Sequence, residues 1–226
     1  MSVPGWLAVH DRDGAIAEAF GALSRRQAIH AAAGVTAAAA VHGLTADAQA
    51  APSSDRGDVA VLNYALTLEY VQAAFYSEAE RGGALRGPLA EQARVVGAHE
   101  RAHVTAFRRV LGTQAVAVPR FDFRGTTEEP EAFRKTAVAF EDLAVAAYKD
   151  QIPLLRQPAF LAAAVAIHSV EARHAAWIRR LAGVLPAAHA FDEPLPRAEV
   201  TRLVASTRFV VSRPRTSGTS APRLTG

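Results

Sequence analysis

Six residues of only two chemical types, glutamate and histidine, stand where the chain otherwise repeats apolar residues at helical spacing. Four of them form two Glu-x-x-His pairs, and a single glutamate precedes each pair. The set consists of Glu69, Glu100, His103, Glu141, Glu171 and His174. Residues three apart lie on one face of a helix, so both side chains of a pair can reach the same ion. The pattern therefore predicts metal binding by carboxylate and imidazole ligands.

Charge and spacing both support this prediction. A carboxylate on the apolar face of a helix is costly unless it is paired or bound to a metal, and two divalent ions would neutralise four carboxylates. A tyrosine follows each single glutamate by seven residues, as Tyr76 and Tyr148, so the chain resembles two similar helix pairs. These tyrosines are candidates for supporting donors or radical-quenching groups, or for simple packing. The alternative for the six residues is a set of surface glutamates and core histidines on ordinary helices.

The elements that must position these residues are helices. Apolar periodicity, with Gly and Pro at the ends, predicts helices over about 58–81, 88–111, 128–152 and 158–183, with a short fifth helix within 197–210. Thr127 is the expected N-cap of the third helix. The longest connection, residues 113–127, separates the two helix pairs, and no segment shows a strand pattern. We expect an all-α, up-down four-helix bundle with one long crossover.

The N-terminal segment is typical of an export signal. Arg25 and Arg26 precede a short apolar run at 29–41, and an Ala-x-Ala site ends at Ala50. This order predicts a twin-arginine-type signal peptide over 1–50, recognised by the twin-arginine export machinery. The alternative is an amphipathic helix that is never cleaved. Export would place the protein in the periplasm, the cell envelope or outside the cell, with no membrane span after cleavage.

The remaining boundaries follow from composition. We expect a linker at 51–57, the bundle at 58–185, an extension with the short helix at 186–211, and a disordered tail at 212–226. The 226 residues include no cysteine, which excludes disulfides, thiolate-bound zinc and iron–sulfur clusters. The net charge is only +3 and the basic residues are dispersed, so no nucleic-acid partner is expected.

Several stretches carry a resemblance to a known family. They are 62–70, 74–76, 119–123, 147–149 and 170–176. On these residues the chain resembles the ferritin-like domain family, which includes exported bacterial proteins and plant desiccation-related proteins. The resemblance implies that Glu100 and Glu171 bridge two metal ions and that Glu69 and Glu141 are terminal ligands. The chain departs from many relatives at Gln72, where they carry a second acidic residue.

Three further residues lie close to the expected site. His168 precedes Glu171 by three residues and is a candidate for a seventh ligand, a proton donor or a core residue. His99 lies one step around the helix and is not expected to be a ligand. Gly97 leaves space that would either admit a small oxidant or allow close helix packing.

Oxygen and nitrogen ligands suit two Fe or Mn ions, and Zn can enter by affinity. We expect redox chemistry with O2, peroxide or ferrous iron in stress defence, with an external electron donor. One alternative is a non-catalytic desiccation- or stress-related protein with a structural metal site. Another is a binding or scaffold bundle whose site is empty. A homo-oligomer is compatible with each of them.

Overall fold

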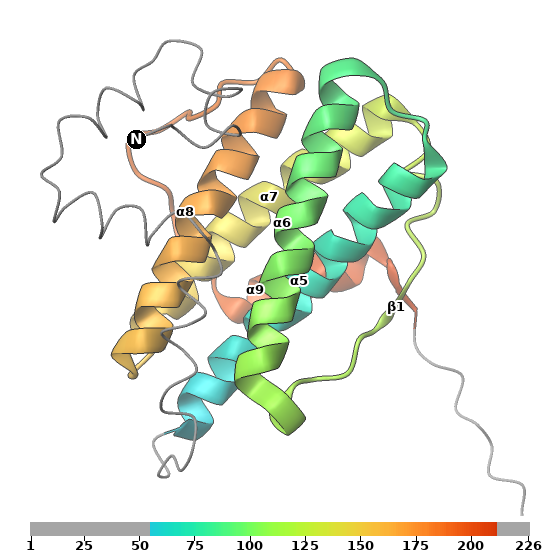
Figure 1. Ribbon diagram of the computed structural model, residues 1–226. Helices are drawn as coiled ribbons and strands as arrows, with labels where there is room; N and C mark the ends of the chain where they lie inside the picture. The colour runs from blue at the N-terminus through green and yellow to red at the C-terminus, as the bar shows by residue number, and fades with distance from the viewer. Residues whose placement is uncertain (1–54, 212–226) are drawn as a thin grey trace, which may run out of the picture. The chain divides into compact units, whose positions relative to one another are not determined.

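The computed structural model describes residues 55–211 (Figure 1). Its bundle consists of four helices: α5 (Asp55–Gly82), α6 (Gly87–Leu111), α7 (Pro130–Gln151) and α8 (Pro158–Leu181). Helix α5 packs against α6 and α7 packs against α8, and α5 and α7 run in opposite directions. The expected all-α four-helix bundle is confirmed. The expected signal peptide and C-terminal tail lie outside the described residues.

The connections agree with the expected short–long–short pattern. Residues 83–86 join α5 to α6, and a 3-10 turn, η2 (Ile152–Leu154), leads from α7 towards α8. The long crossover, residues 112–129, contains the 3-10 turn η1 (Gly112–Gln114) and the strand β1 (Arg120–Phe121). Gly112 has φ +55°, a conformation that glycine adopts without strain, and it ends α6.

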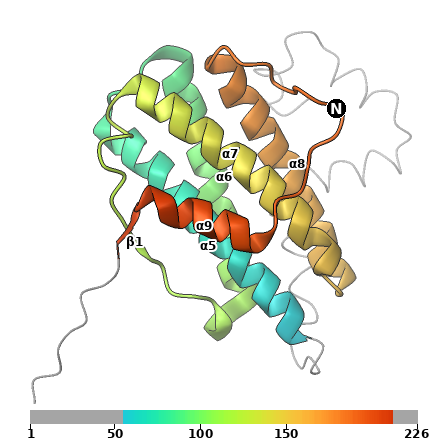
Figure 2. The same ribbon diagram turned by 180° about the vertical axis from the view of Figure 1, so that it is seen from behind.

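The C-terminal part of the described chain covers one side of the bundle. Helix α9 (Arg197–Thr207) lies across α5 and α7, on the side away from α6 and α8 (Figure 2). Its Val200 is buried in a cluster with Tyr64 and Ala147. The side formed by α6 and α8 has no such cover within residues 55–211.

A short strand pair was not expected from the sequence. The strand β2 (Val210–Val211) pairs antiparallel with β1, so that Arg120 faces Val211 and Phe121 faces Val210. Two-residue strands are too short for an alternating pattern, which explains why the sequence does not reveal them. The pair ties the end of the described chain to the crossover.

The start of α7 differs from the expectation. The N-cap is Glu129 rather than Thr127. The Glu129 carboxylate accepts hydrogen bonds from the backbone N–H groups of Glu131, at 3.0 Å, and Ala132, at 2.8 Å. Pro130 disfavours helical geometry in the residue before it, so the helix cannot begin earlier. The Thr127 hydroxyl donates instead to Glu78 Oε1 at 2.8 Å.

Helix α5 begins three residues earlier than expected and includes the end of the expected linker. Asp58 is fully buried one turn inside α5. Its carboxylate accepts the backbone N–H groups of Arg156 and Gln157, each at 3.0 Å. This contact fixes the start of α8 against the start of α5 and satisfies donors that a helix end leaves free.

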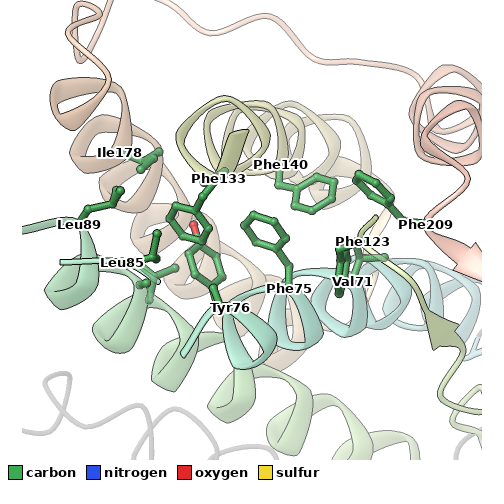
Figure 3. Packing of buried hydrophobic residues seen from close by; sticks show 14 residues of the cluster. Val71, Phe75, Tyr76, Leu85, Leu89, Phe123, Phe133, Phe140, Ile178 and Phe209 are labelled. Atoms are coloured by element: carbon green, nitrogen blue, oxygen red, sulfur yellow. The ribbon is translucent and has the colours of Figure 1, made fainter. Parts of the chain in front are cut away.

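An aromatic cluster forms the core at one end of the bundle (Figure 3). The Phe75 ring stacks on Phe133 at a centroid distance of 5.0 Å and meets Phe140 and Phe123 edge-on, at 5.2 and 5.4 Å. Phe209 packs on Phe123 at 5.4 Å. Crossover, bundle and C-terminal extension therefore share one core. No helix in the described part is long and apolar enough to span a membrane.

Candidate metal centre

The four bundle helices bring the six predicted residues together in the interior. They form two overlapping groups, and within each group the candidate ligand atoms all lie within 4.8 Å of one another. One group contains Glu69, Glu100, His103 and Glu171, and the other contains Glu100, Glu141, Glu171 and His174. All four glutamates have no exposed surface. Glu100 and Glu171 belong to both groups, so either carboxylate could contact two ions.

Both histidines direct the same ring nitrogen at the carboxylates. His103 Nδ1 lies 3.2 Å from Glu69 Oε2 and 3.2 Å from Glu171 Oε1. His174 Nδ1 lies 3.1 Å from Glu100 Oε1 and 3.6 Å from Glu141 Oε2. Each group therefore offers three carboxylates and one imidazole nitrogen to a common centre.

Several of these atoms are buried without a hydrogen bond. Within the described chain, both oxygens of Glu100 and of Glu171 have no aligned donor, and neither has Glu141 Oε2. His174 Nδ1 is also buried without an aligned hydrogen bond, although it lies 3.1 Å from Glu100 Oε1. Buried polar atoms are normally hydrogen-bonded, and unsatisfied ones in native proteins indicate that a water molecule or an ion completes the site. A donor set of carboxylate and imidazole fits Fe, Mn or Zn.

The metal-free cluster retains protons. Burial and the charge of Glu171 raise the pKa of Glu100 well above its usual value. Burial lowers the pKa of both histidines, but the surrounding carboxylates outweigh it, so the pKa of His103 and that of His174 are raised. Burial opposes ionisation of Glu171 as well, yet its contacts with the two histidines lower its pKa. Binding of metal ions would have to displace these protons.

The two predicted tyrosines contact the carboxylates crosswise. Tyr76 of α5 donates to Glu141 Oε1 of α7 at 2.5 Å, and Tyr148 of α7 donates to Glu69 Oε1 of α5. Burial and the adjacent carboxylate raise the pKa of each phenol well above 10, so both keep their protons. Seven residues are about 10.5 Å along a helix. Because α5 and α7 are antiparallel, that step places each tyrosine beside the glutamate of the other helix.

Two residues near the centre have roles that the sequence does not reveal. His99 Nδ1 lies 2.9 Å from Nε2 of His174, and the two rings stack at 5.1 Å. Burial and His174 lower the pKa of His99 to about 4. Gln92, fully buried, donates to the Tyr76 hydroxyl at 3.5 Å. Both contacts depend on which helices face each other.

The other candidates lie outside the two groups. The ring of His168 lies 6.4 Å from that of Tyr148, and no ligand group includes it. A Cβ atom at Gly97 would lie 2.9 Å from Tyr76 Cβ, so this glycine allows α6 to approach α5 closely. Gln72 is buried with no hydrogen-bond partner in the described part, beside a cavity of about 10 Å³ that is also lined by Val204.

Comparison with known proteins agrees with this geometry. Residues 57–184, more than half of the chain, match the family described as the ferritin-like domain. This range covers all of α5 except its first two residues, all of α6, α7 and α8, and all six residues of the centre. No curated protein matches the chain.

Proposed function

Because the chain belongs to the ferritin-like domain family, we propose that its bundle holds two metal ions and acts on O2, peroxide or ferrous iron. The supporting observation is the pair of overlapping ligand groups whose buried oxygens lack aligned donors. Glu100 and Glu171 would bridge the ions, because they belong to both groups. Glu69 with His103 would complete one position, and Glu141 with His174 the other.

The metal ions would be Fe or Mn and would supply one-electron redox steps. The protein's own groups orient the ligands and limit access. Tyr148 and Tyr76 hold the terminal carboxylates through hydrogen bonds, and their raised pKa values keep these donors protonated. The substrate would be O2, peroxide or ferrous iron, and the absence of cysteine from the sequence means that electrons would come from an external donor.

Elemental analysis tests the proposal most directly. The mature chain, residues 51–226, would be purified without chelator from a host with working twin-arginine export. We expect about two equivalents of Fe or Mn, as in other dimetal bundles. The double variant Glu100→Ala/His103→Ala should lose the metal, whereas Glu91→Ala, which removes an exposed carboxylate of the same helix, should retain it. Wild-type protein without metal would refute the proposal.

The complete burial of all four glutamates also suits a second function, a structural metal site in a non-catalytic stress- or desiccation-related protein. The two functions differ in turnover. Metal-loaded protein that consumes peroxide or oxidises ferrous iron is an oxidoreductase. Metal that raises the melting temperature without turnover would identify a structural site.

Export is proposed on the N-terminal sequence alone. A reporter fused after residues 1–52 should reach the periplasm, the envelope or the medium. Replacement of Arg25 and Arg26 by Lys should block this transport, because the paired arginines identify the twin-arginine route. A reporter that is exported equally well by both versions would contradict this route.

A further inference from the structure

The two halves of the centre are alike in their ligands but differ in what supports them. Glu100 and Glu171 are 71 residues apart, as are His103 and His174. At the same offset, His99 of the first half corresponds to Val170 of the second. An imidazole thus stands in one half where the other has an aliphatic side chain that cannot form a hydrogen bond.

His99 supports only one of the two histidine ligands. Its Nδ1 lies 2.9 Å from Nε2 of His174, while Nδ1 of His174 faces the carboxylates. A metal ion at Nδ1 requires the proton of His174 to be on Nε2, and His99 Nδ1 is placed to accept it. The near-parallel stacking, with 18° between the planes, holds the orientation of the ring. No residue of the described chain forms an equivalent hydrogen bond with Nε2 of His103.

We infer that His99 is a positioning residue that makes the two metal positions unequal, so that the position of His174 binds its ion more tightly. This inference rests on the proposed dimetal function. The hydrogen bond fixes the tautomer and the direction of His174 before the ion arrives. Such partners of metal-bound histidines typically change metal affinity by about 10- to 100-fold.

Titration of the metal-free mature protein with Co²⁺ tests the inference by calorimetry and visible absorption. Wild type should bind in two resolved steps, and His174→Ala should remove the tighter one. His99→Val, which copies the second half, should weaken the tighter step by about 10- to 100-fold and leave the other unchanged. His99→Asn should restore much of the loss, because the Asn side-chain oxygen replaces Nδ1 as acceptor.

The control is His168→Val, which removes a histidine outside both ligand groups and should leave both steps unchanged. His99 is only partly buried, so its variants should fold, and the melting temperature of the metal-free forms verifies this. The inference is overturned if His99→Val changes neither step or both equally, if Asn does not restore binding, or if His168→Val has the same effect. A wild type that binds no Co²⁺ refutes the dimetal function itself.

Discussion

Removal of single tyrosine hydroxyls measures how strongly the crossed contacts hold the centre together. Tyr148 is 4% exposed and its hydroxyl donates to the buried carboxylate of Glu69. Tyr64 is 7% exposed, but its hydroxyl is buried without a hydrogen-bond partner among the described residues. The same substitution, Tyr→Phe, therefore removes a charge-assisted hydrogen bond in one case and an unsatisfied group in the other.

The expected magnitudes differ clearly. A hydrogen bond to a charged group contributes about 1.5–3 kcal/mol, so Tyr148→Phe should cost about 2 kcal/mol in the metal-free protein. For a domain of this size that lowers the melting temperature by about 4–8 °C. Tyr64→Phe should be neutral or slightly stabilising, because the Arg197 guanidinium, 4.8 Å from the ring centre, can remain above a Phe ring.

Thermal unfolding of both variants in the presence of a chelator provides the measurement. Tyr76→Phe should cost as much as Tyr148→Phe or less, because its hydroxyl also donates to a buried carboxyl, that of Glu141, and burial raises the pKa of this carboxyl. Equal melting temperatures for the Tyr148→Phe and Tyr64→Phe variants would show that the crossed contacts contribute nothing to stability. That result would refute the role assigned to the tyrosines.

Three further predictions concern packing and protonation. Gly97→Ala should be about 1–3 kcal/mol less stable than Gly57→Ala in chemical denaturation, since a Cβ meets α5 at the first position and open space at the second. Phe209→Ala should cost about 3 kcal/mol, whereas Phe191→Ala, at an 82% exposed position, should change stability by less than about 0.5 kcal/mol; equal losses would contradict the shared core. The pKa of both His103 and His174 is raised in the metal-free protein, so metal ions compete with protons for these side chains. The apparent affinity of the centre for metal should therefore increase from pH 6 to pH 8. Calorimetry in buffers of different ionisation enthalpy should detect the protons released on metal binding, and no release would contradict the protonated cluster.

The sequence is sufficient to identify the helices and the six central residues. Each Glu-x-x-His pair occupies one helix face by geometry alone, and Gly and Pro residues mark most helix ends. The start of α7 was predicted wrongly because Thr127 is a good cap in isolation, whereas Pro130 and the Glu129 carboxylate fix the cap two residues later. Which of two neighbouring residues caps a helix depends on which backbone N–H groups lack a hydrogen-bond partner in the folded chain.

Contacts between helices are harder to predict. The seven-residue spacing identified Tyr76 and Tyr148, but the glutamate that each one contacts depends on the relative direction of α5 and α7. His99 was not expected among the ligands, and its contact with His174 could not be predicted because it requires α6 and α8 to lie side by side. Helical periodicity describes one helix at a time and contains no information on such neighbours.

The crossed tyrosines also have an evolutionary consequence. Tyr76 of the first half contacts Glu141 of the second, and Tyr148 of the second half contacts Glu69 of the first. Such a reciprocal pair of contacts is what a two-fold axis produces in a homodimer. Two copies of one helical hairpin would supply the same six ligands, so the bundle has the layout of a fused dimer with residues 112–129 as the junction. Fusion frees the two halves to diverge within one gene. A difference such as that between His99 and Val170 cannot occur in a symmetric dimer of identical chains.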